Sequence, residues 1–246
     1  MPRFFVSPEA IGEKEITVSG ADAHHIARSL RMAEGDRVTL CDGEGEEYTC
    51  RLSRIRDEEC TAEILSHGRA YTESPVRITL FMAYPKGDKM ETVVQKAVEL
   101  GASRIVAFES ARCIKRPAKD KTEKLLARLS RISEEAAKQC GRGVIPTVTG
   151  IYDPKGVMKE GSELDLLLLC YENESSVTLR RVLEEKADGG VSSIGIIIGS
   201  EGGFSEEEAE FFKKGGAISV NLGPRILRCE TAPEYALSAI SYHFEL

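Results

Sequence analysis

The stretch that decides the fold is IIIGSEGGFSEEE, residues 196–208. It starts as an apolar run of strand length and enters a turn with three glycines in five residues. It ends where Ser205 and Glu208 have the spacing of a capping box, which predicts the start of a helix. Glycines let a backbone approach a ligand closely, and α/β proteins bind ligands at the carboxyl ends of parallel strands. The turn therefore indicates a ligand site, with a tight turn that binds nothing as the alternative.

The glycine-rich turn differs from the known phosphate-binding motifs. Neither G-x-G-x-x-G nor G-x-x-x-x-G-K-[ST] is present, which disfavours a dinucleotide or ATP site. Glu201 within the turn would also repel a pyrophosphate. A carboxylate suits a cationic ligand better, and the sulfonium of S-adenosylmethionine is one such cation.

A second motif, VNLGPRILRCETA, occupies residues 220–232. A strand is expected to end at Gly223, and the following loop carries the apolar residues Ile226 and Leu227. Apolar side chains on a short loop need a partner, which is either a flat adenine ring or the domain core. The segment 230–232 is expected to open the last helix.

The pattern around these motifs predicts an α/β fold. Apolar strands alternate with amphipathic helices, which is typical of a mainly parallel sheet. The predicted strands are 77–83, 104–108, 165–170, 193–198 and 217–221, and the predicted helices are 90–98, 121–140, 206–214 and 230–244.

Residues 1–70 have a different pattern, with short, closely spaced strands that suggest a small β-barrel. The strands are expected at 4–6, 15–18, 37–41, 47–55 and 60–65, with a helix at 22–32 and a hairpin turn at 42–45. A polar stretch at 70–75 ends in proline and marks a boundary. We therefore expect two domains, 1–72 and 73–246.

Charge and cysteine usage narrow the functional class. The chain has 246 residues and a net charge of −7, yet residues 84–145 hold 14 Lys/Arg against 8 Asp/Glu. That basic segment fits either a phosphate-binding surface or a solvated helical face. The seven cysteines lack a C-x-x-C pair, so no disulfide framework or metal site is expected. No apolar run has the roughly 20 residues of a membrane span, and no signal peptide is visible, so a cytoplasmic location is expected.

A third motif, QCGR at 139–142, completes a set that resembles the SPOUT superfamily of methyltransferases. The family pattern has a glycine-rich loop like 199–204, a leucine-glycine segment like 222–232 and a helix end like 139–142. The resemblance extends to PKGDKME at 85–91, KAVELG at 96–101 and RFF at 3–5, in the same order. It is strongest to the branch that methylates N3 of a uridine in 16S ribosomal RNA.

The resemblance implies a fold and a cofactor that periodicity does not show. The fold is a SPOUT-type α/β domain with a C-terminal trefoil knot, preceded by a PUA-like β-barrel, in a homodimer. The cofactor is S-adenosylmethionine. Carried over by position, the residues expected to bind it are Tyr171, Glu172, Ile198, Gly199, Glu201, Gly203, Asn221, Leu222, Gly223, Ile226, Leu227 and Thr231.

The expected reaction needs a group that stabilises the uracil ring as its N3 proton leaves. Arg228 is the candidate for that role, and Glu230 is the candidate proton acceptor. An equal alternative is that the two residues only pair with each other and brace the loop. RNA contacts are expected from Arg3, Arg28, Arg31, Lys86, Lys89, Lys115, Arg116, Gln139 and Arg142.

Two departures from the family pattern occur in the motifs. Ser200 replaces a proline, which predicts a slightly more mobile loop, and Cys229 replaces a threonine. Two other functions remain open: a SPOUT enzyme that methylates ribose 2′-hydroxyls of tRNA or rRNA, and a non-catalytic RNA-binding factor of ribosome assembly. An NAD-dependent oxidoreductase fits the α/β pattern alone and lacks the fingerprint.

Overall fold

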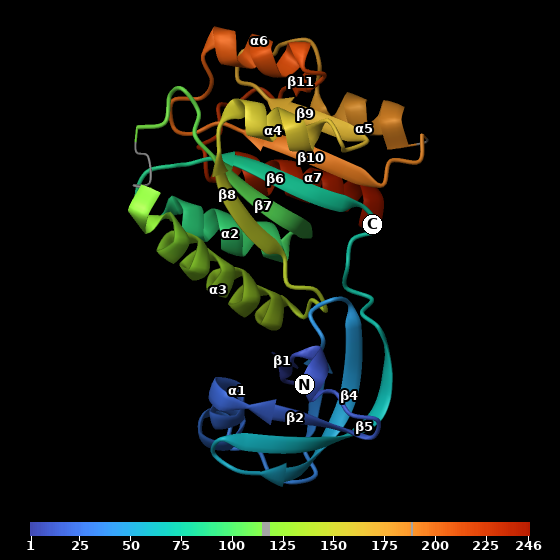
Figure 1. Cartoon of the computed structure of the whole chain (residues 1–246). Coiled ribbons are helices and arrows are strands. Elements are labelled where there is room, and N and C mark those ends of the chain that lie inside the picture. The colour runs from blue at the N-terminus through green and yellow to red at the C-terminus, as the bar shows by residue number, and fades with distance from the viewer. Residues whose placement is uncertain (115–118, 188) are drawn as a thin grey trace. The chain divides into compact units, whose positions relative to one another are not determined.

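The computed structural model describes residues 1–114, 119–187 and 189–246 (Figure 1). The chain forms two compact units. The first comprises Met1–Glu73 and Ala137–Ile145, and the second comprises Ser74–Ala136 and Pro146–Leu246. The sequence placed the boundary within one residue of Glu73, but it did not assign the second segment, 137–145, to the first unit.

The first unit is built on a curved five-stranded sheet with the order β1-β3-β4-β5-β2. β1 runs parallel to β3, and the other neighbours are antiparallel. Two register shifts between β4 and β5 bend these long strands, as bulges do. The strands are Arg3–Phe5 (β1), Glu15–Ser19 (β2), Arg37–Cys41 (β3), Glu46–Ile55 (β4) and Glu59–Arg69 (β5).

The core of the first unit lies between this sheet and the segment that follows β2, where Phe4, Ile16, Leu40 and Leu52 are buried with Ile26. Ile26 comes from the segment that the sequence predicted as one helix. The structure divides that segment into a short helix, Gly20–His24 (α1), and a π-helical turn, His25–Ser29 (η2). A short 3-10 turn, Pro8–Ala10 (η1), precedes β2.

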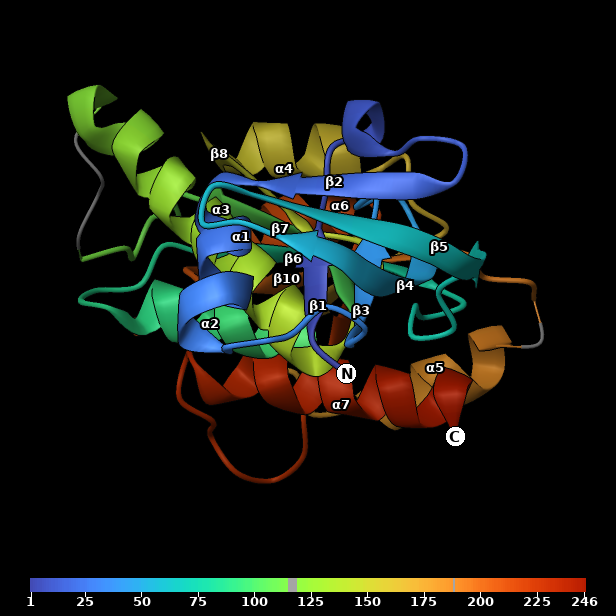
Figure 2. The same ribbon diagram turned by 90° about the horizontal axis from the view of Figure 1, so that it is seen from below.

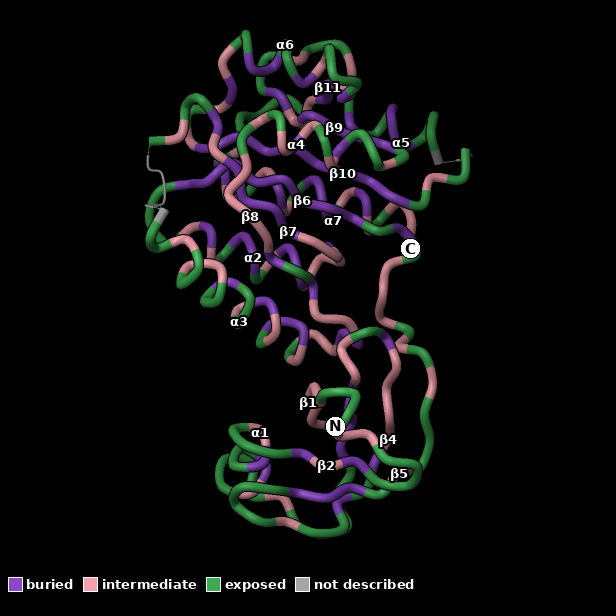
Figure 3. The backbone as a smooth tube through the Cα atoms, viewed as in Figure 1, coloured by how far each residue is buried: buried purple, intermediate pink, exposed green. Residues whose placement is uncertain are grey.

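The second unit is a doubly covered parallel sheet with the order β11-β9-β10-β6-β7-β8. Strand β10 is buried along its whole length and β6 from Ile78 to Ala83 (Figure 3), because helices cover both faces of a parallel sheet. The strands are Arg77–Ala83 (β6), Ala102–Phe108 (β7), Thr147–Tyr152 (β8), Leu166–Cys170 (β9), Ser193–Ile198 (β10) and Ile218–Val220 (β11).

Helices α2 and α7 pack against each other, and α5 contacts α7 (Figure 2). Helices α4 and α6 contact each other and the strands β8 and β9. The helices are Lys89–Glu99 (α2), Thr122–Cys140 (α3, after the 3-10 turn Lys119–Lys121), Pro154–Gly161 (α4), Leu179–Ala187 (α5), Glu206–Lys214 (α6) and Thr231–Glu245 (α7). The sequence had not predicted β8, α4 or α5.

The C-terminal segment positions the two motifs side by side. After β11 the chain passes the loop that follows β9, because Asn221 accepts a hydrogen bond from Leu179 N–H and donates one to Val177. It then turns into α7, which packs against β10 and α2. The loops 199–205 and 221–230 therefore meet at the carboxyl ends of β9 and β10, in the region where the family's knot is expected.

Candidate functional site

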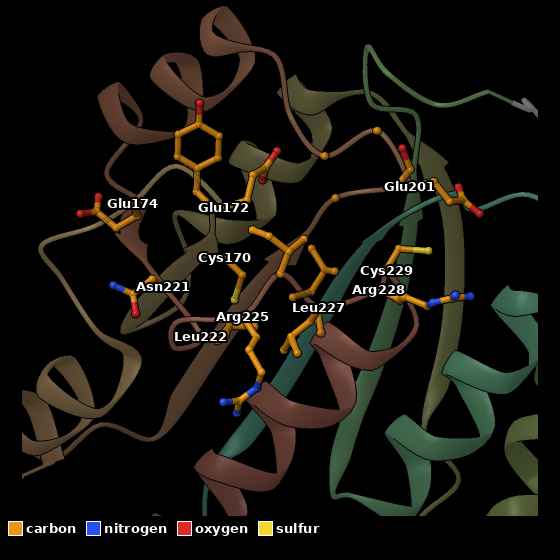
Figure 4. Close-up of a pocket in the computed structure, with 18 of the residues that line it drawn as sticks. Cys170, Glu172, Glu174, Glu201, Asn221, Leu222, Arg225, Leu227, Arg228 and Cys229 are labelled. Carbon is orange, nitrogen blue, oxygen red and sulfur yellow. The ribbon is translucent and has the colours of Figure 1, made fainter.

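A cavity of about 710 Å³ lies in the second unit where these loops meet (Figure 4). Its size suits a cofactor-sized ligand. Four segments form it: the loop after β9, the glycine-rich loop after β10, the loop between β11 and α7, and the segment before α2. The lining residues are Lys86, Lys89, 170–172, Glu174, 198–203, 221–223, 225–229 and Ala232. Of the twelve residues predicted to bind a cofactor, only Thr231 is not among them.

The glycine-rich loop needs glycine at two of its positions. Gly203 has φ 61°, and a Cβ there would lie 1.9 Å from Oε1 of Glu172. A Cβ on Gly199 would lie 3.1 Å from the backbone of Gly203. The Gly203 N–H also donates to the carbonyl of Ser200 at 2.9 Å, which closes the turn. The loop can therefore fold back on itself and bring Glu172 against its backbone.

The segment after β7 anchors this loop, and nothing in the sequence pattern indicated it. The buried Ser200 hydroxyl donates to the carbonyl of Arg112 at 3.3 Å, and the Arg112 guanidinium donates to the carbonyl of Gly202 at 3.1 Å. At the base of the loop, the buried carboxylate of Glu208 accepts from the Ser110 hydroxyl at 2.7 Å. The serine in the family's proline position thus has its own structural partner.

The cavity has an apolar side and a charged rim. Ile198, Leu222 and Leu227 line its apolar side. Ile226 is 81% exposed although it also lines the cavity. An apolar residue that exposed on a binding loop is available to pack on a flat ligand or on a partner surface.

Three carboxylates surround the cavity, with Glu172 and Glu174 on one side and Glu201 on the other (Figure 4). Glu174 accepts hydrogen bonds from the hydroxyl and backbone N–H of Ser176, which lower its pKa to about 2. Glu172 has no hydrogen-bond or ion-pair partner among the described residues. The carboxylate of Glu172 is therefore available to pair with a cationic ligand.

Lys89, the first residue of α2, joins the two loops. Its Nζ lies 3.2 Å from Glu201 Oε1 and 3.0 Å from Glu230 Oε2, and 3.7 Å from the Cys229 sulfur. The hydrogen bond to Glu230 is the main cause that raises the pKa of Lys89 and lowers that of Glu230 to about 2. We call Lys89, Glu201 and Glu230 the loop clamp.

Glu201 and Cys229 take part in the same set of contacts around Lys89. Burial alone would raise the pKa of Glu201, but hydrogen bonds from its own N–H, from Lys89 and from Lys86 N–H lower it on balance. Burial, followed by the hydrogen bond to Glu230, raises the pKa of the Cys229 thiol to about 12. At neutral pH both carboxylates are charged and the thiol is protonated.

The two residues expected to be catalytic have different surroundings. Arg228 lines the cavity and is exposed, and its guanidinium has no ion-pair or hydrogen-bond partner in the described part of the chain, although its carbonyl accepts from the N–H groups of Thr231 and Ala232. Glu230 is not among the lining residues and is engaged by Lys89 and Cys229. The alternative in which Arg228 and Glu230 pair to brace the loop is not what the structure shows; Lys89 is the partner of Glu230.

The residues expected to contact RNA are dispersed. Lys86 and Lys89 line the cavity, but Lys89 belongs to the loop clamp. In the first unit, Arg3 is paired with Glu47 at 2.9 Å and Arg28 with Asp57. Arg31 and Gln139 are exposed, and among the described residues Arg31 is the one non-glycine residue with a positive φ, 52°.

The surroundings of Arg142 do not fit the RNA contact that the sequence predicted for it. Its guanidinium donates hydrogen bonds to the Glu73 carboxylate inside the first unit, at 2.6, 3.1 and 3.4 Å, and the residue is only 4% exposed. A buried, paired guanidinium is a structural brace and is not presented to a phosphate. The predicted contacts of Lys115 and Arg116 lie outside the described residues.

Within the described residues, no group of three or more His, Cys, Asp or Glu side chains has the geometry to hold a metal ion. In those same residues, no helix combines the length and the hydropathy that a bilayer-spanning segment requires.

Comparison with known families matches both units. Residues 72–241 match the model of an RNA methyltransferase domain, and residues 18–65 match that of an RNA methyltransferase PUA domain. The chain is 33% identical over 252 residues to ribosomal RNA small subunit methyltransferase E of Bacillus subtilis, covering 100% of this chain and 98% of that protein. It is 32% identical to the protein of that name from Synechocystis, covering 97% of this chain and 77% of the relative.

Solved structures agree with the sequence matches. The methyltransferase E of Neisseria gonorrhoeae, bound to S-adenosylmethionine, has a TM-score of 0.82 and 31% identity, covering 98% and 97% of the two chains. A Legionella pneumophila methyltransferase in complex with the same cofactor has a TM-score of 0.84 and 30% identity, covering 98% and 96%. The chain therefore belongs to the ribosomal RNA small subunit methyltransferase E family, with a SPOUT-type methyltransferase domain after a PUA-like one.

Proposed function

We propose that this protein transfers the methyl group of S-adenosylmethionine to N3 of a specific uridine in 16S ribosomal RNA. The observation that carries the proposal is the cavity between the glycine-rich loop and the loop 221–230, in a chain that belongs to this family. The names of the relatives, and the cofactor in two related structures, support the substrate and the methyl donor.

The residues of the cavity fit S-adenosylmethionine. Ile198, Leu222 and Leu227 offer an apolar surface for an adenine ring. The glycine-rich loop lines the cavity from Gly199 to Gly203, so a bound ligand would lie against its backbone. The uncommitted carboxylate of Glu172 matches a ligand that carries positive charge. When bound there, this cofactor supplies a methyl group on a sulfonium.

The task of the protein is to position the uracil ring and to stabilise it as the N3 proton leaves. The exposed guanidinium of Arg228, on the cavity wall, is the group that can face a uracil carbonyl oxygen as negative charge develops there. Glu230 is a weak candidate for the proton acceptor, because a carboxylate with a pKa of about 2 that is bonded to Lys89 has little affinity for a proton. We infer that solvent takes the proton while Arg228 holds the ring.

RNA phosphates would be held by cations that are not already paired. Lys86 at the cavity mouth and Arg31 in the first unit are exposed and have no ion-pair partner among the described residues. Such contacts position the RNA and carry little sequence information. We therefore expect the choice of uridine to depend on the shape of the assembled small subunit.

A homodimer is part of the proposal. Helix α7 buries Ala236, Leu237 and Ile240 against the sheet, yet it leaves Tyr235 44% and Tyr242 73% exposed. Exposed tyrosines seven residues apart lie on one helix face, and such residues are enriched in interfaces. Sedimentation velocity of the parent and of Tyr242→Glu tests this, since a dimer through α7 should dissociate in the variant. Because the proposed substrate is part of the ribosome, we expect the enzyme to act in the cytoplasm.

The test of the proposed function uses the complete protein. It is incubated with radiolabelled S-adenosylmethionine and small ribosomal subunits that lack the modification, and the RNA is digested to nucleosides. We expect 3-methyluridine. A labelled 2′-O-methyl nucleoside would instead identify a ribose methyltransferase, and a protein that binds the subunit without binding the cofactor would be an assembly factor.

A further inference from the structure

The loop clamp places one ammonium between carboxylates from two different loops. Glu201 belongs to the glycine-rich loop after β10, Glu230 is the residue before α7, and Lys89 is the first residue of α2. Lys89 precedes both carboxylates by more than a hundred positions in the sequence. The two carboxylates therefore share a single cation, and each depends on it for charge compensation.

The position of Lys89 argues against a contact with RNA phosphate. An ammonium has three N–H donors, and in Lys89 two of them are directed at carboxylates, with the Cys229 sulfur 3.7 Å away. A phosphate that approached Lys89 would also approach both carboxylates, and it would be repelled by them. Lys86, by contrast, is exposed, and its side chain has no such partner in the described residues.

We propose that Lys89 is a positioning residue that clamps the glycine-rich loop to the start of α7, so that the two walls of the cavity keep the separation that catalysis requires. The proposal rests on the methyltransferase function proposed above. Without the ammonium, Glu201 and Glu230 face each other as like charges, and the loops move apart. The cavity then holds the methyl donor, and Arg228 beside it, in the wrong geometry.

A double-mutant cycle tests the clamp. Lys89→Met, Glu230→Gln and the double variant are compared with the parent for turnover on small subunits and for affinity for S-adenosylmethionine. Because a misplacement of about 1 Å can cost about 100-fold in rate, we expect a loss of that order in Lys89→Met. Removal of one carboxylate from the pair relieves the repulsion, so the double variant should recover about 10-fold or more relative to Lys89→Met. Lys89→Arg, which keeps the charge, should stay much closer to the parent.

Lys96→Met is the matched control, because Lys96 lies on the same helix and is ion-paired with Glu99 at 2.8 Å, outside the cavity lining. It should leave turnover unchanged, and equal melting temperatures of the variants show that they fold. If Lys89→Met and Glu230→Gln combine additively, or if Lys89→Met only weakens RNA binding and flattens its salt dependence, the clamp is wrong. A parent protein that neither binds the cofactor nor methylates the subunit would instead overturn the proposed function.

Discussion

At the scale of single residues, Glu172 and Gly203 show how two loops make one wall of the cavity. Gly203 takes a left-handed conformation, and the space that its missing side chain leaves is occupied by the carboxylate of Glu172. The other two carboxylates of the rim are compensated by Ser176 or by Lys89, whereas Glu172 has no partner in the described residues. A cationic group of the ligand is the partner that this arrangement lacks.

Glu172→Gln should therefore weaken binding of S-adenosylmethionine by about 10-fold, which is the effect of about 1.4 kcal/mol. Isothermal titration calorimetry with S-adenosylmethionine and with S-adenosylhomocysteine measures this. If Glu172 faces the sulfonium, only the first ligand loses affinity, because the second has no sulfonium charge. If it faces the amino group, both lose affinity equally. Unchanged affinity for both ligands would remove Glu172 from the site.

Arg228 lies at the cavity wall with its guanidinium uncommitted, so its contribution should appear in the transition state. We expect Arg228→Gln to lower kcat by about 100-fold, because removal of one donor that stabilises a developing negative charge has that order of effect. Cofactor affinity should stay within about twofold of the parent, measured by the same calorimetry. Loss of cofactor binding with unchanged kcat would show that Arg228 holds the donor and does not act on the uracil.

The sequence predicted the lining of the cavity better than the roles of the charged residues. Glycines and apolar residues on loops have few functions other than close approach and packing, so their positions indicate the pocket directly. The ion-pair partners of Lys89, Glu230 and Arg142 were not foreseen, because a charged side chain in a sequence does not show its partner. Lys89 is separated from Glu230 by 141 positions, and only the fold brings them together.

At the scale of elements, long periodic segments were predicted and short ones were missed. Helix α2 and strand β10 have clear apolar patterns, and Ser205 caps α6 by accepting from Glu208 N–H as the capping box predicts. Strand β8 was missed because it is an edge strand with Gly150 in the middle. The start of α4 did carry a signal, since Asp153 accepts from Gly156 N–H and Pro154 occupies the first turn.

Strand β10 begins beside Asp165, which accepts hydrogen bonds from the hydroxyl and N–H groups of Ser192 and Ser193. These bonds lower the pKa of Asp165 to about 2. The carboxylate form is thus the bonded form, and its contribution to stability is present above the ordinary aspartate pKa of about 4 and is lost as the pH falls toward 2.

Asp165→Asn should therefore melt at a lower temperature than the parent at pH 7, and the difference should shrink between about pH 4 and pH 2. Thermal unfolding followed by circular dichroism across this pH range measures it. The neighbouring Glu163→Gln is the control, since Glu163 is exposed and has no comparable set of bonds. A difference between Asp165→Asn and the parent that is constant with pH would mean that the charge of Asp165 contributes nothing.

At the scale of the whole molecule, the chain passes between its two units three times, after Glu73, Ala136 and Ile145. The sequence predicted one boundary because composition changes at 70–75. The return of 137–145 was not visible, because these residues continue a helical pattern and end in an ordinary glycine stop. Here Glu73, the last residue of the first segment, is held by Arg142 and by the N–H of Gly143 at 3.1 Å.

This arrangement makes Arg142 a test of how the first unit is held together. Arg142→Ala leaves Glu73 without its charge partner, and breaking a buried ion pair costs about 3 kcal/mol. Hydrogen exchange should therefore become faster at residues 43–45, 69–73 and 141–145, while the cavity loops 199–203 and 221–229 keep the parent's protection and cofactor affinity. Arg69→Ala is the control, because Arg69 is exposed and its pair with Glu46 lies at the surface. If Arg142 instead contacts RNA directly, the variant would keep its stability and lose affinity for the subunit, with a shallower salt dependence by about one phosphate.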